Sequence, residues 1–234
     1  MEKLLFFSFL AGLCTFLGAV LLFIKRQWSQ ESLGIFLGLA SGVMAAVVFF
    51  DMLPSALLGD WQGCSAGLLL GIVILGFFDH YLLQQLMAEK TMLSLGYLIM
   101  LGMALHDLPE GMAIAMGHEM KARTGILIAL AIGIHNIPEG MAIAAPLIIG
   151  GLGKLRIAFQ LALIALLTPL GTILGLFLVN ALPKLMSPLL GFASGIMLYL
   201  VIFHLWPQAG AKGEKNRRLG FITGVVVILL ATFL

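Results

Sequence analysis

Residues 38–54 read GLASGVMAAVVFFDMLP, and residues 191–207 read GFASGIMLYLVIFHLWP. The two stretches lie 153 positions apart, and eight of their 17 positions are identical. At the same offset, TFLG at 15–18 pairs with TPLG at 168–171. The glycines at 67 and 71 likewise pair with those at 220 and 224. One offset that holds over three apolar segments indicates an internal repeat, and we expect its paired glycines to allow close helix packing.

The composition identifies the class of protein. Of 234 residues, 61% are hydrophobic and only 10% are charged. A soluble fold of this size needs a polar shell that such a chain does not supply, so we predict an integral membrane protein. The net charge of +2 gives no support to a nucleic-acid partner. The two cysteines, Cys14 and Cys64, lack CxxC spacing and predict no disulfide framework.

Hydropathy predicts eight transmembrane helices, since about 20 apolar residues are needed to cross a bilayer. Their ranges are 4–24, 33–54, 64–83, 94–117, 124–149, 157–181, 187–206 and 217–234. The first range belongs to the repeat, and no small-residue cleavage site follows it, so we interpret it as a span and not as a signal peptide.

The predicted fold is therefore an all-α integral membrane protein with one transmembrane domain over residues 1–234. Repeat A (1–83) and repeat B (154–234) flank a central helix pair (94–149). Spans 1–3 recur as spans 6–8, so the second copy has the opposite orientation in the membrane. Inverted repeats around a site at the membrane midplane are typical of secondary transporters.

The distribution of lysine and arginine predicts the orientation. The N-terminus and the loops after spans 2, 4 and 6 hold four such residues: Lys3, Lys121, Arg123 and Lys184. The opposite side holds nine: Lys25, Arg26, Lys90, Lys154, Arg156, Lys212, Lys215, Arg217 and Arg218. Because positive residues collect in cytoplasmic loops, both termini are predicted to be extracytoplasmic in the plasma (cytoplasmic) membrane.

Two similar motifs fall near the middle of spans 4 and 5. Residues 106–115 read HDLPEGMAIA, and residues 135–144 read HNIPEGMAIA. A charged residue at the bilayer centre costs about 2.5–3.5 kcal/mol even on the insertion scale. The motifs place three carboxylates there: Asp107, Glu110 and Glu139. The central parts of the spans contain no Lys or Arg, so the expected counterion is a metal ion or protons.

The spacing within the motifs favours a metal. His106 and Glu110 are four residues apart and share one helix face, and His135 and Glu139 repeat the pattern on the next span. Two imidazoles and two carboxylates form a ligand set suited to Zn²⁺ or its first-row neighbours. A proline in each motif frees a backbone carbonyl, and we expect irregular backbone there, lining a cavity.

The motifs, the eight spans and the extracytoplasmic termini resemble the ZIP family of divalent-metal transporters, most closely its bacterial GufA-type branch. The resemblance implies an elevator-like or rocking transporter that moves Zn²⁺, and often Fe²⁺, Mn²⁺ or Co²⁺, toward the cytoplasm, with Cd²⁺ as a further candidate. It also implies a paired metal site formed by His106, Asp107, Glu110, His135, Asn136 and Glu139. In some members a methionine of span 2 joins this site, and Met44 occupies that position.

The chain departs from the family pattern at several positions. Asp107 stands where Asn is usual, Thr168 stands where the branch has a glutamate, and His204 occupies a region where the branch has another. A histidine-rich loop between spans 3 and 4 is missing. The three motif carboxylates total −3 against +4 for two divalent ions, which predicts one full metal site and fractional occupancy of a second.

Other polar residues suggest a route for the ion. It would enter past Asp51 and leave past His204 and the pair Asp79-His80, while His118 lies in the outer loop between the motif helices. The alternative is that these are ordinary polar residues near the membrane surface.

Three functional alternatives stay open from sequence. The first is a metal importer, the second is a metal exporter or metal/proton exchanger on the same scaffold, and the third is an intramembrane zinc hydrolase. The hydrolase is disfavoured because no HExxH motif is present. We therefore predict that the chain is not an enzyme and uses no catalytic cofactor. Its expected partners are the divalent metal, the lipid bilayer and a second copy of itself in a homodimer, with no nucleic acid.

Overall fold

The computed structural model describes residues 1–24, 28–83, 92–178, 181 and 183–233, and every regular element in them is helical. The α-helices are α1 (Glu2–Phe23), α2 (Gln30–Val47), α3 (Leu53–Phe77), α5 (Met92–Met120), α6 (Ala122–Ile149), α7 (Lys154–Ile164), α8 (Leu167–Leu178), α9 (Met186–Leu200), α10 (Trp206–Ala211) and α11 (Glu214–Phe233). Three π-helical turns, η1 (Val48–Met52), η2 (Phe78–Leu83) and η4 (Val201–Leu205), and one 3₁₀ turn, η3 (Pro183–Leu185), join some of them. The predicted cytoplasmic residues Lys25, Arg26 and Lys90 lie outside the described residues.

Six helical stretches in the described part of the chain are long and apolar enough to cross a membrane. They are Glu2–Phe23, Gln30–Tyr81, Met92–Met120, Ala122–Ile149, Lys154–Leu178 and Met186–Ala211. The 52-residue stretch contains one span predicted from sequence, 33–54, and all but the last two residues of another, 64–83. Helix α11 contains most of the predicted span 217–234 and extends over 20 residues.

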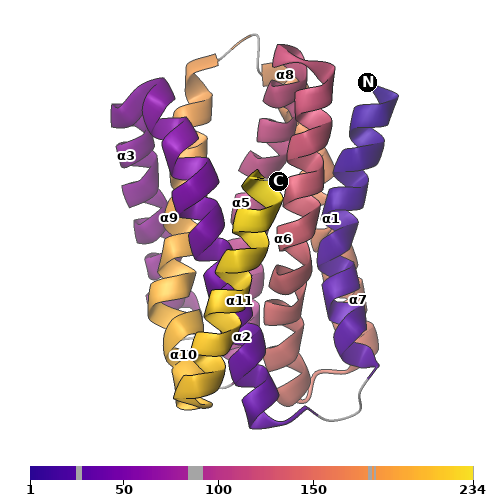
Figure 1. The fold of residues 1–234 in the computed structure, drawn as a ribbon, viewed down its shortest axis with the longest axis vertical. Helices are drawn as coiled ribbons and strands as arrows, with labels where there is room; N and C mark the ends of the chain where they lie inside the picture. The colour runs from indigo at the N-terminus through magenta and orange to yellow at the C-terminus, as the bar shows by residue number, and fades with distance from the viewer. Residues whose placement is uncertain (25–27, 84–91, 179–180, 182, 234) are drawn as a thin grey trace.

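The long stretch Gln30–Tyr81 changes direction near Asp60. This residue has φ −151° and ψ 97°, which are extended and not helical values. Figure 1 shows the chain turning back at its upper end, so that the later part of α3 runs back down beside α9. The carboxylate of Asp60 folds over Gly63, a position typical of a residue that caps the start of a helix. The second half of α3 therefore begins after Asp60.

The prolines act differently in different helices. Helices α5 and α6 continue without interruption through Pro109 and Pro138. Our prediction of irregular backbone at these prolines is therefore wrong. Neighbouring helical turns and tight packing hold the helix in place. By contrast, the predicted span 157–181 is divided into α7 and α8 at Ala165. Pro169 has no N–H for the Ala165 carbonyl, so the helix is weakest at this point.

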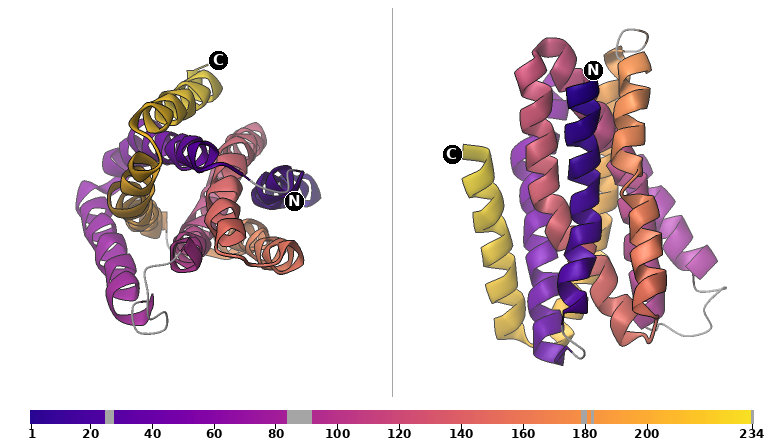
Figure 2. Two further views of the ribbon diagram at one scale, coloured as in Figure 1. Left: turned by 90° about the horizontal axis from the view of Figure 1, so that it is seen from below. Right: turned by 90° about the vertical axis from the view of Figure 1, so that its right-hand side faces the viewer.

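The helices pack most extensively in two groups. In one group, α1 packs on α6, and α5 packs on both α6 and α8. In the other group, α3 packs on α9, and α2 packs on α11. Smaller contacts between α5 and α9 and between α2 and α6 connect the two groups. Figure 2 shows α1, in indigo, and α11, in yellow, at separate places on the outer edge of the assembly when it is seen from below.

Glycines let the backbones within each group touch. On α3, Gly67 and Gly71 lie against backbone carbonyls of α9, and on α9, Gly191 and Gly195 lie against backbone carbonyls of α3. A Cβ at any of these four positions would overlap a carbonyl oxygen. The close approach predicted for the repeated GxxxG pairs is confirmed at this interface.

We predict that Gly67→Val and Gly195→Val each destabilise the protein, because a new side chain must push two backbones apart. Overpacking of this kind costs about 1–3 kcal/mol or more. The measurement is the thermal unfolding midpoint of the purified protein in detergent. Gly153→Val is the control, because a Cβ there meets nothing within 4 Å. Equal midpoints for all three variants would contradict this packing argument.

Candidate metal centre

The two sequence motifs come together on adjacent helices. Helix α5 carries His106, Asp107 and Glu110, and helix α6 carries His135 and Glu139. None of these five residues is more than 3% exposed. The motifs lie near the middle of their helices, so the cluster is predicted to lie deep in the membrane.

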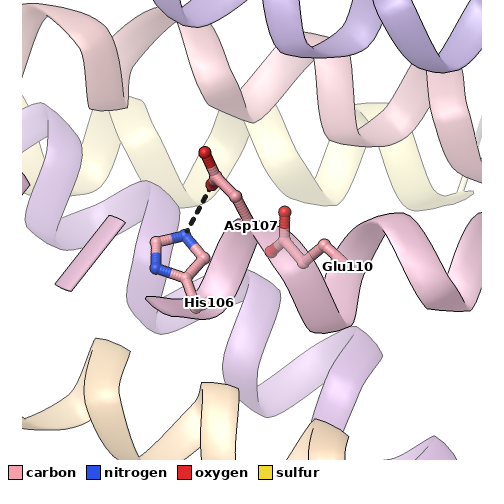
Figure 3. Close-up of side chains that lie close together, drawn as sticks. All are labelled: His106, Asp107 and Glu110. Atoms are coloured by element: carbon pink, nitrogen blue, oxygen red, sulfur yellow. Dashed lines mark ion pairs between the residues drawn. The ribbon is translucent and has the colours of Figure 1, made fainter. Parts of the chain in front are cut away.

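His106 is oriented by its own helix. Its Nδ1 lies 2.9 Å from the carbonyl oxygen of Gly102, one turn earlier. A carbonyl oxygen only accepts hydrogen bonds, so Nδ1 carries the proton and donates it. The other ring nitrogen, Nε2, lies 3.6 Å from an oxygen of Asp107 and 3.6 Å from an oxygen of Glu139. Figure 3 shows the pair His106–Asp107 beside Glu110 on one stretch of α5.

The second histidine is paired across the helices. His135 Nε2 on α6 lies 3.2 Å from Glu110 Oε2 on α5. Each histidine therefore faces the glutamate of the opposite motif. The helix faces predicted from the i, i+4 spacing lie toward each other. The structure thus pairs each imidazole with a carboxylate of the other motif.

Most of the polar atoms of the cluster have no hydrogen-bond partner. The unpartnered buried atoms include His106 Nε2, both oxygens of Asp107, both oxygens of Glu139 and Oε1 of Glu110. Among the described residues, no Lys or Arg nitrogen lies within 4.0 Å of these carboxylates. Buried charges without partners are unstable, so the donor atoms have the character of a cation-binding group.

The spacing of the donor atoms suits a small divalent ion. One ligand atom each from His106, Asp107 and Glu110 fits within a mutual distance of 4.8 Å. Zinc binds nitrogen and oxygen at about 2.0–2.2 Å in tetrahedral sites, so two of its ligands lie roughly 3.4 Å apart. The imidazole–carboxylate distances of 3.2 and 3.6 Å match that separation.

Three other residues named from sequence lie in different surroundings. The amide of Asn136 donates from Nδ2 to the carbonyl of Ala11 on α1 at 3.0 Å, and its Oδ1 is buried without a partner. Met44 is completely buried in the main hydrophobic core. Thr168 is completely buried, and its hydroxyl has no partner. Asn136 is therefore tied to α1 through its nitrogen, which leaves only its oxygen for an ion.

Each site helix is in close backbone contact with a second helix at glycine positions. On α5, a Cβ at Gly111 would overlap the carbonyl of Thr168 on α8, and a Cβ at Gly171 would overlap the carbonyl of Leu108. Helix α6 has the corresponding arrangement with α1. There, Gly140 lies against the carbonyl of Thr15, and Gly18 lies against that of Ile137. Each PEG motif is thus pressed against a second helix by direct backbone contact.

A cavity of about 560 Å³ reaches the cluster from one end of the molecule. Glu110 and His135 line its inner part, and Met120, Thr124 and Lys184 line it at the end where α5 meets α6. The remaining lining residues are Val47, Asp51, Met52, Ser55, Gly59, Asp60, Ala113, Met116, Gly117, Ile128, Ile132, Met186, Ser187 and Leu190. Asp51, proposed from sequence as an entry residue, lines this cavity, whereas Asp60 and Lys184 were not singled out as functional.

A separate polar cluster forms between η2 and η4. Asp79 Oδ2 lies 2.9 Å from His204 Nε2 and accepts a hydrogen bond from the Tyr199 hydroxyl at 2.8 Å. The sequence pointed to Asp79 and His204 but not to Tyr199. Only the packing of α9 on α3 reveals that tyrosine, because its ring lies over Gly76.

Comparison with known proteins identifies the family. The family model described as ZIP Zinc transporter matches residues 83–232. Proteins named Zinc transporter ZupT are similar over almost the whole chain. That of Salmonella paratyphi A (strain ATCC 9150 / SARB42) is 32% identical over 97% of this chain and 95% of the relative. Those of Salmonella newport (strain SL254) and Salmonella heidelberg (strain SL476) are 32% and 31% identical over the same shares.

These matches cover the site helices and their supporting helices together, and they agree with the long apolar stretches of the structure. The family resemblance found in the motifs is thereby confirmed. This multi-pass, all-helical membrane protein belongs to the ZIP zinc transporter family.

Proposed function

We propose that this protein carries divalent metal ions, Zn²⁺ foremost, across the plasma membrane toward the cytoplasm. Fe²⁺, Mn²⁺, Co²⁺ and Cd²⁺ are further candidate substrates. The proposed binding residues are His106, Asp107, Glu110, His135, Asn136, Glu139 and Met44. The observation that carries the proposal is a set of two buried imidazoles and three buried carboxylates on adjacent helices, with most of their ligand atoms unpartnered.

The protonation of His106 supports this role. Its Nδ1 donates to the Gly102 carbonyl, so a neutral ring presents the lone pair of Nε2 toward two carboxylates. Such a contact between acceptors is repulsive unless a cation lies between them. A backbone hydrogen bond to the remote nitrogen is the usual way in which proteins orient a metal-binding histidine. A proton on Nε2 would also relieve the repulsion, and metal binding would then release it.

The cavity supports entry from one side of the membrane. It connects Glu110 and His135 with Lys184 and with the hairpin between α5 and α6. The excess of positive residues on the opposite side favours an extracytoplasmic location for this hairpin and for both termini. Ions would then enter past Asp51 and Asp60 and leave toward the cluster of Asp79, Tyr199 and His204.

Eight spans in an inverted repeat are the topology that we propose. A helix of 52 residues would be about 78 Å long, which is more than twice the thickness of a bilayer core, so Gln30–Tyr81 is best divided at Asp60. Helix α11 is the eighth span. The equivalent backbone contacts of Thr15 on α6 and Thr168 on α5, at the repeat offset of 153, support the repeat within the single domain.

The two helix groups support a mechanism in which one group moves against the other. Close backbone contacts at glycine join helices within each group, as at Gly140 and Gly195. Between the groups, the atoms nearest to a Cβ at Gly102 on α5 belong to side chains of α9, those of Ile196 and Leu200. Side-chain packing permits sliding more readily than interlocked backbones do, which favours the elevator-like or rocking motion implied by the family.

We propose one tightly bound metal per chain and a weaker second one. The carboxylates of Asp107, Glu110 and Glu139 supply −3, and the neutral hydroxyl of Thr168 is a poor ligand for a divalent ion. Asp107 has both oxygens unpartnered and is the candidate ligand for the weaker position. The GufA-type branch and a homodimeric assembly remain predictions.

The alternatives to an importer are a metal exporter, a metal/proton exchanger and an intramembrane zinc hydrolase. An exporter or a metal/proton exchanger would use the same buried residues, and vesicle uptake with and without a pH gradient distinguishes these from an importer. The intramembrane zinc hydrolase is excluded, because the chain belongs to a transporter family. The prediction that the protein is not an enzyme is thereby confirmed.

We predict that His106→Ala and Glu139→Ala each reduce Zn²⁺ uptake into proteoliposomes to near background. Each change removes a ligand and leaves the remaining buried charges unbalanced. Glu119→Ala is the matched control, because it removes an exposed carboxylate from the end of the same helix as His106. Uptake at the wild-type rate by well-folded forms of either site variant would refute the assignment.

A second prediction concerns access to the cavity. In a background of Cys14→Ala and Cys64→Ala, we expect Ser55→Cys to react with a membrane-impermeant thiol reagent added outside intact cells. Zn²⁺ should slow this reaction, because Ser55 lines the cavity that leads to the site. Ser194→Cys, at a completely buried position, is the control and should not react. Labelling of Ser55→Cys only after the cytoplasmic side is exposed would reverse the proposed orientation.

A further inference from the structure

A chain of hydrogen bonds connects three helices next to the site. Ser8 Oγ on α1 lies 2.6 Å from Thr172 Oγ1 on α8. Thr172 Oγ1 lies 2.9 Å from the carbonyl oxygen of Gly111 on α5. Both side chains are completely buried. Neither residue belongs to the two motifs, and the proposed binding site does not include them.

The direction of these hydrogen bonds follows from the number of protons. Thr172 has one hydroxyl proton, and it can donate to the carbonyl of Gly111 or, at 3.1 Å, to that of Thr168 in its own helix. When Thr172 donates to one of these carbonyls, which only accept, the hydrogen bond with Ser8 is donated by Ser8. Because Ser8 donates, the hydroxyl proton of Thr172 is available for the nearer carbonyl, that of Gly111.

These hydrogen bonds support the turn of α5 that carries Glu110. Pro109 removes one backbone hydrogen bond from this turn, which is therefore weaker than the rest of the helix. Helix α8 touches the turn on both sides, at Leu108 through Gly171 and at Gly111 through Thr168. The hydroxyl of Thr172 adds a hydrogen bond at the residue that directly follows Glu110.

The corresponding turn of α6 lacks this support. Its backbone contacts with α1 are equivalent, but the position 153 residues before Thr172 is Ala19, which has no hydroxyl. The only side-chain hydrogen bond described between α6 and α1 comes from Asn136, which precedes the proline of its motif. The hydrogen bonds from Ser8 and Thr172 therefore reach only one of the two motifs, which distinguishes Glu110 from Glu139.

We propose that Thr172, oriented by Ser8, is a positioning residue for Glu110 and thereby sets the affinity of the site for a divalent ion. The proposal rests on the proposed function, because it assigns Glu110 a role in metal binding. Groups that orient a metal ligand typically change metal affinity by about 10- to 100-fold when they are removed. Here the effect passes through one backbone turn, so we expect the lower end of that range.

The test measures Zn²⁺ binding to the purified full-length protein by isothermal titration calorimetry. Thr172→Val preserves the shape of the side chain and should raise the dissociation constant about tenfold. Thr172→Ser restores the hydroxyl and should recover most of the affinity. In transport, Thr172→Val should raise KM far more than it lowers kcat. Thr223→Val is the matched control, because that hydroxyl is exposed and bonds only to Leu219 of its own helix.

The outcomes separate the two proposals. An unchanged dissociation constant for Thr172→Val would overturn the positioning role, as would equal weakening of binding by Thr172→Ser. If Thr172→Val does not fold, Ser8→Ala is measured instead, and it should weaken binding to a smaller extent. Unchanged binding by Ser8→Ala would then overturn the proposal. Failure of the unaltered protein to bind Zn²⁺ would overturn the proposed function itself.

Discussion

Three carboxylates buried between apolar helices, with no Lys or Arg nitrogen of the described residues within 4.0 Å of them, are the constraint on which the rest of this structure depends. In a membrane each such charge costs about 2.5–3.5 kcal/mol even by the insertion scale. Asp107, Glu110 and Glu139 are tolerated only where a cation reaches them, so the fold must provide a place for that cation and a route to it. The two histidines, the cavity and the supporting helices all meet this requirement.

The fold meets the requirement by holding two helices rigid and close. The backbones of α1 and α8 press against α6 and α5 at the motif glycines, so the helices stay continuous through their prolines. A rigid pair of helices keeps the ligand atoms at zinc-like separations, as a coordination site requires. The same glycines would be costly to replace, which explains why they accompany the charged residues in both motifs.

The two motifs are nevertheless not equivalent. Asp107 and Asn136 occupy matching positions, yet Asp107 faces His106 while the amide nitrogen of Asn136 is bonded to α1. Thr172 has a hydroxyl where its repeat counterpart, Ala19, has none. The surroundings of two similar motifs are thus made asymmetric by single side chains.

The sequence by itself determined the class of protein, the approximate helix ranges and the candidate site residues His106, Glu110, His135 and Glu139, because hydropathy and i, i+4 spacing are local properties. It did not determine that His106 faces Glu139 and that His135 faces Glu110, since this pairing depends on how α5 packs on α6. It also missed Tyr199 and the role of Ser8, whose partners are 120 and 164 positions away. Contacts between distant residues leave no periodic pattern in one sequence, so only the tertiary structure revealed them.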